Sequence, residues 1–505
     1  MKEEQRTSPW ALLMSGYLWA CIAAFALIRF GGGLTNAHLY AAAADVFGLS
    51  REIATLLGGA VLLGFALIAR FRPRLLNARA ICAVSVACQA IMVAVFLLWS
   101  SSYPAAALTA TVLLRAVAIA LAEVLFACSV LKLESLAQVA AVIGFGFLIN
   151  RAASPLLAMV PSPEAAVAGI AIAGVIVAVF GYHSGKKTLD TLRSGEAADD
   201  VELVNPDSFI RSSHGLFFCV MLFSMANGYA LTLHEVRNAP LQAGFEGIVI
   251  AVLVLYVILV RNKEQEDRLF SFAVLLVVAG LLSAPISFEF ADLATVPMAL
   301  INTGQVAFVA LLWMVFVGVG KRNLYAFMPV FGLAECMSDI GITFGAVVGH
   351  ESNALIGSNT LLAVCFSTLI VFAFFAFLWL EFRTFSFTAT INGVQELPVA
   401  ETPGDDRVSE DGEERQRAEE ESDSAFDLSC ERIAAEHGLT PRETEIFILL
   451  AHGRNGRFIM DHFVISRNTT KSHIKHIYTK LGVHSHQELI DLAERDSRVT
   501  ANRSL

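Results

Sequence analysis

Long apolar runs dominate the first 380 or so residues of the chain. A helix needs about 20 apolar residues to cross a hydrocarbon core of ~30 Å. Runs of about that length predict twelve membrane-spanning helices, at 10–31, 52–70, 81–100, 105–131, 136–159, 164–183, 213–233, 242–260, 269–288, 294–319, 324–348 and 358–381. The pattern therefore predicts an all-α, polytopic bundle over residues 1–385. Because eleven similar runs follow the first, we interpret that run as a span and not as a cleaved leader.

A polar stretch at 184–212 divides the runs into two sets of six. Two six-helix halves joined by a long inner loop resemble the major facilitator transporters, in which the halves enclose a central cavity near the membrane midplane. The resemblance covers residues 1–385 and implies such a cavity here. In the loop "GFALIARFRPRLLNAR", however, Ala69 stands where the superfamily has an acidic residue, and Phe65 stands near its glycine. That departure counts against transport, because the loop is associated with the rocking of the halves.

The loop charges predict an orientation. Under alternating topology most loop cations fall on one side, namely Lys2, Arg6, Arg70, Arg72, Arg74, Arg79, Lys132, Lys186, Lys187, Arg193, Arg211, Arg261, Lys263, Arg268, Lys321 and Arg322. The opposite side has little beyond Arg29, Arg51 and Arg237. By the positive-inside rule we expect a cytoplasmic (inner) membrane protein with both termini in the cytoplasm.

Composition agrees with the membrane prediction. Of 505 residues, 56% are hydrophobic and only 16% are charged, whereas an ordinary soluble domain has about 25% charged residues. The net charge of -10 is unevenly distributed, since residues 401–438 hold fourteen acids against four Arg. The eight cysteines include no C-x-x-C pair, and seven lie in apolar runs. We therefore expect packed thiols, and neither a disulfide framework nor a zinc site.

Five ionisable residues lie inside the predicted spans: Arg115, Glu123, Arg151, Glu335 and Asp339. A charge in hydrocarbon costs several kcal/mol unless it faces a partner or a cavity. Interhelical ion pairing or snorkelling near helix ends is one interpretation. The other is that these residues line a ligand cavity, in which Arg115 and Arg151 would bind an anionic group of a small molecule.

The apolar pattern stops at Thr384. Residues 396–427 are charged, contain proline and are poor in aromatic residues, a composition typical of disorder. We therefore predict an acidic disordered linker at 386–427. By random-coil scaling it would let a small domain range tens of ångströms from the bilayer.

Residues 428–505 carry dense local signals for four short helices. Thr440 and Glu443 form a capping box with Pro441 at the first helical position. An apolar stripe follows at Ile446, Leu449 and Leu450, and this first helix stops at Gly453. A second helix is predicted over 456–463, with Ile459 and Phe463 facing inward.

Ser466 is placed to cap the third helix and Gly482 to end it. Its apolar residues recur at helical spacing: Ile474, Ile477, Tyr478 and Leu481. Its polar residues lie on the opposite face: Asn468, Lys471, Ser472 and Lys475. Ser485 and Glu488 would cap a fourth helix. Two helices joined by a tight turn, the second with a basic face, are typical of a helix-turn-helix, whose second helix enters the major groove.

Residues 439–492 resemble the LuxR-type (GerE-like) DNA-binding domain through "LTPRE", "LLAHG" and "NTTKSHI". The resemblance implies that Lys471, Ser472 and Lys475 face base edges of double-stranded DNA. It also implies that Thr469 and His473 approach phosphates, with Ser466, Asn468 and Thr470 beside them at the start of the helix. The departures are Thr470 for the usual valine, Met460 for a small alanine, and His486 where arginine is common. A merely solvated helix face, or a metal site at the histidines, are alternative interpretations.

Together these patterns favour a membrane-embedded one-component transcription regulator. A small molecule bound in the bundle would shift it between two conformations, and the C-terminal domain would bind DNA as a homodimer. The alternatives are an active transporter with a fused regulatory domain, and a structural DNA tether without a ligand. No nucleophile–base–acid set, phosphate loop or metal cluster is evident in the sequence, so we expect neither an enzyme nor a cofactor.

Overall fold

The computed structural model describes residues 15–43, 46, 48–102, 104–235, 246–259, 265–383, 385–397 and 426–501. Over these ranges the chain is helical and contains no strand, which confirms the all-α prediction. It divides into two compact units. The first unit comprises Met1–Gly195, Arg211–Lys321 and Phe327–Asn392, and the second comprises Glu196–Ile210, Arg322–Ala326 and Gly393–Leu505.

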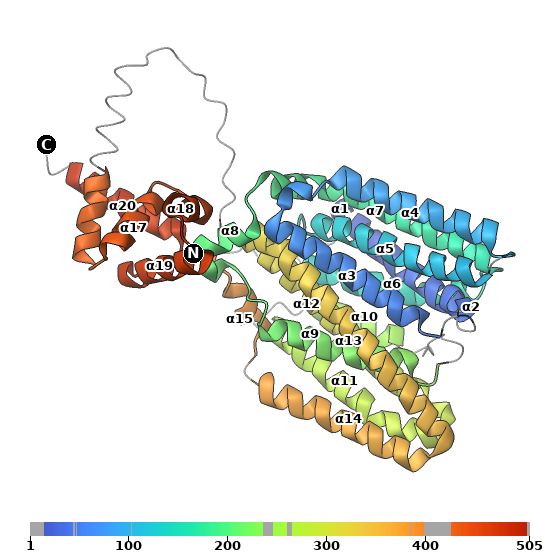
Figure 1. The fold of residues 1–505 in the computed structure, drawn as a ribbon. Coiled ribbons are helices and arrows are strands. Elements are labelled where there is room, and N and C mark those ends of the chain that lie inside the picture. Colours follow the sequence, from blue (N-terminus) through green and yellow to red (C-terminus); the bar gives the residue numbers. More distant parts are fainter. Residues whose placement is uncertain are drawn as a thin grey trace. The chain divides into compact units, whose positions relative to one another are not determined.

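The first unit is an apolar helical bundle with two sets of six main helices (Figure 1). The first set is α1 (Gly16–Leu34), α3 (Ser50–Phe71), α4 (Ala78–Trp99), α5 (Pro104–Val130), α6 (Leu136–Leu157) and α7 (Pro163–Ser194). The second set is α9 (Gly215–Thr232), α10 (Glu246–Leu259), α11 (Gln265–Glu289), α12 (Thr295–Arg322), α13 (Leu324–Ser358) and α14 (Thr360–Glu381). Each of the twelve predicted runs thus corresponds to one helix.

Eleven helices in the described part of the chain are long and apolar enough to cross a membrane. The first includes α1, the π-helical turn η2 (Thr35–Tyr40) and α2 (Ala41–Ala43), so it extends well beyond the predicted end at residue 31. The run predicted at 242–260 corresponds to α10, which has 14 residues, fewer than a full crossing needs. Its neighbours 236–245 and 260–264 lie outside the described residues.

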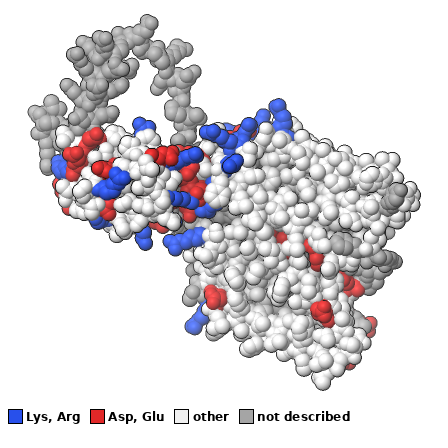
Figure 2. Space-filling model, in the orientation of Figure 1, with Lys and Arg blue, Asp and Glu red and all other residues white. Residues whose placement is uncertain are grey.

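The two sets of helices meet through small residues. A Cβ atom added to Gly332 of α13 would clash with the Leu62 carbonyl oxygen of α3, and one added to Gly144 of α6 would lie 2.5 Å from a Val254 methyl of α10. Small residues permit such close backbone approach between membrane helices. The face of the bundle seen in Figure 2 is almost free of charged side chains, as expected of a surface that meets lipid.

Residues 387–392, predicted as the start of the linker, are helical. Residues Phe387–Asn392 form the short helix α15, in which Phe387 and Ile391 are buried. Asp267 fixes its start by accepting hydrogen bonds from the Ser386 hydroxyl and the Phe387 amide, each 2.7 Å long. These local contacts correct the prediction for residues 386–392. Residues 398–425 of the predicted linker lie outside the described residues.

The second unit contains a helical stretch at 426–436 followed by α17 (Pro441–Ala451), α18 (Gly456–Phe463), α19 (Arg467–Leu481) and α20 (His486–Ala501). Its core is a cluster of buried side chains that includes Ile446, Phe447, Ile459 and Ile477. The unit also contains residues 196–210, here called the inter-half segment, which form α8 (Ala198–Val204) and the 3₁₀ turn η4 (Pro206–Ser208). Leu203 and Val204 of this segment belong to the same core.

Candidate functional site

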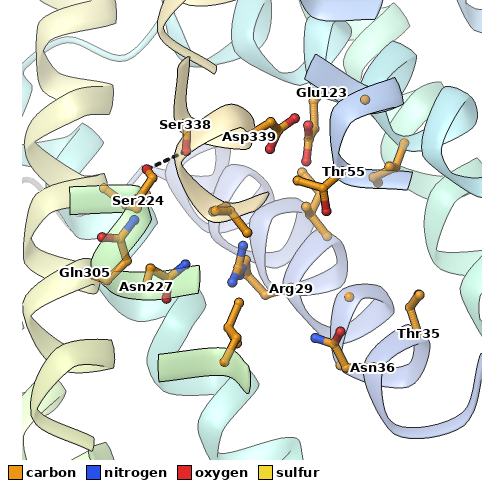
Figure 3. A pocket seen from close by; sticks show the side chains of 18 of the residues that line it. Arg29, Thr35, Asn36, Thr55, Glu123, Ser224, Asn227, Gln305, Ser338 and Asp339 are labelled. Atoms are coloured by element: carbon orange, nitrogen blue, oxygen red, sulfur yellow. Dashed lines mark hydrogen bonds between the residues drawn. The ribbon is translucent and has the colours of Figure 1, made fainter. Parts of the chain in front are cut away.

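The bundle encloses a cavity of about 430 Å³ between its two sets of helices. The side chains lining it come from α1, η2, α3, α5 and α6 of the first set and from α9, α10, α12 and α13 of the second. Figure 3 shows Arg29, Asn227, Glu123 and Asp339 around this space. Its volume falls within the range of about 300–1,000 Å³ that is usual for small-molecule sites.

All five ionisable residues singled out from the sequence line this cavity: Arg115, Glu123, Arg151, Glu335 and Asp339. The sequence interpretation misses Arg29, which it assigns to an external loop. In the structure Arg29 lies inside α1, lines the cavity and stacks over the Phe147 ring with 4.6 Å between its guanidinium carbon and the ring centroid. The span extends further than the apolar run suggests, and this places Arg29 within it.

Several polar atoms on the cavity wall are buried without a hydrogen-bond partner among the described residues: Arg115 Nε, Asn150 Oδ1 and Gln305 Oε1. An unsatisfied buried polar group costs about 1–3 kcal/mol, so such groups favour a bound molecule that would satisfy them. By contrast, the Ser224 and Ser338 hydroxyls are hydrogen-bonded to each other at 2.8 Å across the helices α9 and α13 (Figure 3). The cavity therefore offers both a cationic donor and neutral acceptors.

Aromatic side chains form the rest of the wall. Phe25, Phe147, Trp313 and Phe331 all line the cavity. Trp313 makes edge contacts with the rings of Phe25 and Phe331, at centroid distances of 6.2 Å and 6.0 Å. Ligand pockets commonly combine such an apolar lining with a few placed polar groups. The wall thus fits a small molecule that has an apolar body and at least one charged group.

A buried charge cluster joins the two sets of helices where α3 begins. Arg51 Nη1 lies 3.0 Å from Glu235 Oε2, and the two ring nitrogens of His350 lie 3.0 Å from Glu235 Oε1 and 3.3 Å from Glu52 Oε1. The topology predicted from the loop charges assigns Arg51 to an external loop. In the structure its side chain is only 6% exposed. Because the cluster connects Arg51 and Glu52 to residues of the second set, it holds the halves together at that point.

In the second unit, the predicted capping box at the start of α17 is confirmed. The Thr440 hydroxyl accepts a hydrogen bond from the Glu443 amide, and Glu443 Oε2 accepts one from the Thr440 amide at 2.8 Å. Glu443 Oε2 also lies 2.7 Å from Lys480 Nζ of α19. Burial of Glu443 would raise the pKa of its carboxyl, but the hydrogen bonds from Lys480 and Thr440 outweigh burial and lower the pKa to about 2.

The helix-turn-helix boundaries also agree with the sequence prediction. Asn455 caps α18 by accepting from the Phe458 amide, and Ser466 caps α19 by accepting from the Thr469 amide. The chain leaves α19 at Gly482, whose φ of 69° lies in the left-handed region that glycine tolerates. The turn between α18 and α19 therefore has the local geometry of the motif.

The polar face of α19 is open. Lys471, Ser472 and Lys475, the residues expected to face base edges, are exposed. The residues expected near phosphates or at the helix start are mostly accessible as well: Ser466, Asn468 and Thr469 are exposed and His473 is half-buried. Side chains that contact base edges must be accessible to the DNA groove, and the exposed side chains of Lys471, Ser472 and Lys475 meet that condition.

Thr470 differs from the other residues expected at the helix start. It is fully buried, and its hydroxyl donates a hydrogen bond to the Ser466 carbonyl oxygen at 3.1 Å, within the first turn of α19. The threonine is therefore a core residue of the domain. Ile474, Ile477, Tyr478 and Leu481 share its buried face, as their spacing predicts.

Val464 occupies a strained position in the turn between α18 and α19. Its φ of 53° is left-handed and its side chain is 90% exposed. A β-branched side chain destabilises this backbone conformation, and no packing of the exposed side chain offsets the strain. We expect Val464→Gly to stabilise the domain by about 0.5–1 kcal/mol, after the entropy of an added glycine is subtracted. Thermal unfolding should show it more stable than Val464→Ala, the matched control that keeps Cβ. A Val464→Gly variant less stable than Val464→Ala would contradict this account.

Comparison with solved structures finds transport proteins that are similar to the helical bundle. One is a bacterial homologue of the iron transporter ferroportin in its outward-facing state, with 13% sequence identity, a TM-score of 0.48, and coverage of 72% of this chain and 100% of that chain. Another is the fucose:proton symporter FucP of E. coli, with 12% identity, a TM-score of 0.47, and coverage of 73% and 100%.

Sequence comparison concerns the second unit. The chain is 39% identical over 72 residues to the uncharacterized response regulatory protein YgeK of Escherichia coli (strain K12), and 43% identical over 56 residues to the transcriptional activator protein ExaE of Pseudomonas putida. These matches cover 14% and 11% of this chain, and the chain spans only 49% and 26% of those relatives. Residues 437–493 match the family described as bacterial regulatory proteins, luxR family. The chain is thus a polytopic helical membrane protein that carries a DNA-binding domain of the luxR family at its C-terminal end.

Proposed function

We propose that this protein is a membrane-embedded, one-component transcription regulator that senses a small molecule. In this proposal residues 1–385 form the sensor, residues 428–505 bind double-stranded DNA, and the intervening linker connects them. Both termini would lie in the cytoplasm, because the loop cations follow the positive-inside rule and because DNA is found there.

One observation carries the proposal. A luxR-family domain with an open, basic α19 face occurs in the same chain as a bundle whose cavity has charged and unsatisfied polar groups on its wall. A ligand changes a protein's conformation only through different affinities for two states. A cavity lined by both sets of helices satisfies this condition, since moving one set against the other changes the contacts that a ligand makes.

The ligand class follows from the cavity wall. Arg29, Arg115 and Arg151 supply positive charge, the aromatic rings supply an apolar surface, and Glu123, Glu335 and Asp339 add negative charge on the same wall. We propose a small organic molecule with an apolar part and an anionic group, which Arg115 and Arg151 would hold. DNA binding by the luxR-type domain would occur as a homodimer on a two-fold site.

Replacement of the two cavity arginines tests the sensor. We expect the full-length Arg115→Gln/Arg151→Gln variant to lose reporter induction by members of a library of small carboxylates that act on the unaltered protein. The loss of two charge-assisted hydrogen bonds, each about 1.5–3 kcal/mol, is enough to abolish binding at moderate affinity. Arg383→Gln is the control, because Arg383 is exposed after α14 and does not line the cavity. Unchanged induction in the double variant would rule out this binding mode.

Transport is the second candidate function, favoured by the position of the cavity between two six-helix sets. It makes a different prediction. Ligand-dependent accumulation in sealed vesicles would indicate a transporter with a fused regulatory domain, whereas reporter induction without accumulation would indicate a sensor. Promoter occupancy that ignores every compound would instead indicate a DNA tether.

A further inference from the structure

The inter-half segment, residues 196–210, is bound to the DNA-binding domain as part of its core. Leu203 and Val204 are 2% and 3% exposed and lie in the same buried cluster as Ile459 and Ile477. Leu203 packs so closely against the start of α18 that a Cβ atom added to Gly456 would clash with its Cδ2 atom. Burial of two apolar side chains removes their surface from water and stabilises the contact, so this is a specific docking contact.

Hydrogen bonds fix the register of the docked segment. The buried Tyr478 hydroxyl of α19 donates to the Val204 carbonyl oxygen at 2.6 Å, which supplies the partner that a buried tyrosine requires. The His486 amide, at the start of α20, donates to Asn205 Oδ1 at 3.0 Å. Side-chain packing and backbone recognition thus come from the same short stretch of chain.

The acidic residues of the segment meet the N-terminal ends of the helices. Asn455, the cap of α18, donates to Glu196 Oε1 at 2.8 Å. Arg467, the first residue of α19, donates to the Asp199 carbonyl oxygen at 2.8 Å and forms an ion pair with the Asp199 carboxylate. The segment contains five acids and no Lys or Arg. Its charge therefore complements the partial positive charge of the helix ends.

DNA phosphates bind the same kinds of group that the inter-half segment contacts. Helix N-termini and arginine side chains are common phosphate-binding elements, and such contacts set the position of a protein on the duplex. The inter-half segment leaves Lys471, Ser472 and Lys475 exposed, so it does not cover the groups expected to face bases. The segment instead contacts Tyr478 on the side of α19 and the N-terminal ends of α18, α19 and α20.

We propose that the ends of α18, α19 and α20 form a docking surface whose intramolecular partner is the acidic inter-half segment, and that the phosphate backbone of DNA competes with this segment for the surface. This inference rests on the DNA-binding function proposed above. It assigns the control step to release of the segment, which lies in the sequence between the two six-helix sets.

The segment is also hydrogen-bonded to residues 322–326 and 393–397, which belong to the same unit. Asn323, in the turn between α12 and α13, donates from Nδ2 to the Ser208 carbonyl oxygen at 2.8 Å. The Gln395 amide donates to the Asp207 carbonyl oxygen at 3.2 Å. The turn between α12 and α13 therefore contacts the docked segment directly.

A cysteine pair gives a direct readout of docking. The Cβ position of residue 456 lies 3.3 Å from Leu203 Cβ, close to the separation of about 3.5–4.5 Å found in disulfides. We expect full-length Leu203→Cys/Gly456→Cys protein in lipid nanodiscs to crosslink under mild oxidation, whereas neither single variant does. An excess of random-sequence duplex DNA at low salt, where phosphate contacts dominate binding, should slow the crosslink at least severalfold.

Charge variants test the competition without a crosslink. We expect full-length Asp199→Asn to bind the same random duplex about tenfold more tightly, because a charge-assisted contact that holds the docked state is lost. Asp207→Asn removes the same charge from the same segment at an exposed side chain, and its affinity should match that of the unaltered protein.

The outcomes separate the two proposals. A missing crosslink in a protein that binds the duplex overturns the docking surface, and leaves DNA binding intact. A crosslink that DNA does not slow, although the duplex is bound, overturns the competition. A crosslink in a protein that binds no duplex at any salt concentration overturns the proposed DNA-binding function, and the competition with it. Equal affinities of Asp199→Asn and Asp207→Asn also overturn the competition.

Discussion

Replacement of Lys471 or Lys475 by alanine is expected to weaken binding to the operator by about 1–3 kcal/mol each, and to relax base preference at the contacted positions. Both side chains are exposed on the polar face of α19, whereas the opposite face holds Ile474 and Ile477 in the core. A lysine ammonium group is suited to the guanine acceptors of the major groove. The domain should remain folded, since neither side chain is buried.

Binding to the operator and to scrambled duplexes, measured over a range of salt concentrations, checks this prediction. Arg495→Ala is the matched control, because it removes one exposed positive charge from α20 of the same domain. If the lysine variants weaken binding equally on every sequence and lower the salt dependence by about one counterion, the lysines contact phosphates and the assignment to bases is wrong.

Glu443→Gln should have the largest effect on the stability of the DNA-binding domain. The pKa of the Glu443 carboxyl is lowered from 4.5 to about 2 by its hydrogen bonds with Lys480 and Thr440, which outweigh the effect of burial. A carboxyl with a lowered pKa in the folded state stabilises the fold above its unfolded pKa, and this contribution is lost as the pH falls through the folded value. Because solvent near the domain surface screens part of the interaction, we expect a loss of about 1–2 kcal/mol between about pH 4.5 and pH 2 in the unaltered domain.

Urea denaturation followed by circular dichroism measures this effect on fragment 426–505 with and without the substitution, in the presence of an excess of a peptide of residues 196–210, which completes its core. The variant should be less stable at neutral pH, and its stability should change less than that of the unaltered fragment between about pH 4.5 and pH 2. Glu445→Gln is the control, since Glu445 forms an exposed ion pair with Arg442 and such pairs contribute little. Parallel pH profiles for the unaltered fragment and Glu443→Gln would contradict the assigned role of Glu443.

The DNA-binding domain can be predicted closely because its signals are local. The capping box at Thr440 and Glu443, the cap at Ser466 and the left-handed Gly482 each act within a few residues of their own positions. Periodicity also places Ile474 in the core. The sequence interpretation groups Thr470 with the residues at the helix start, and the structure places its side chain in the core.

The cavity can be predicted only in part. Charges within apolar runs are costly, and this signal identifies Arg115 and Glu335, which the structure places on the wall of one cavity. The sequence does not identify Arg29 as a cavity residue, because it lies near the end of its apolar run. The span extends further through the π-helical turn η2, and this extension depends on packing. The sequence does not predict the charge cluster of Arg51, Glu235 and His350, because its members are far apart in the chain and meet only through tertiary packing.

The inter-half segment illustrates the limit of local patterns. Its sequence is acidic and its apolar residues form no long run, so the pattern indicates no more than a polar loop. Val201, Leu203 and Val204 are candidates for burial, but nothing near them in the sequence identifies the partner. The contact of Leu203 and Val204 with Ile459 and Tyr478 depends on tertiary packing, which periodicity does not report.

The contribution of Leu203 and Val204 to the core also affects the order of folding. The hydrogen bond between Tyr478 and Val204 joins residues 274 positions apart, whereas the contacts among α17, α18 and α19 are local and form fast. During synthesis the segment emerges well before its partner and must wait for the second set of bundle helices. The DNA-binding domain therefore completes its core last, by a slow loop closure that can follow membrane insertion.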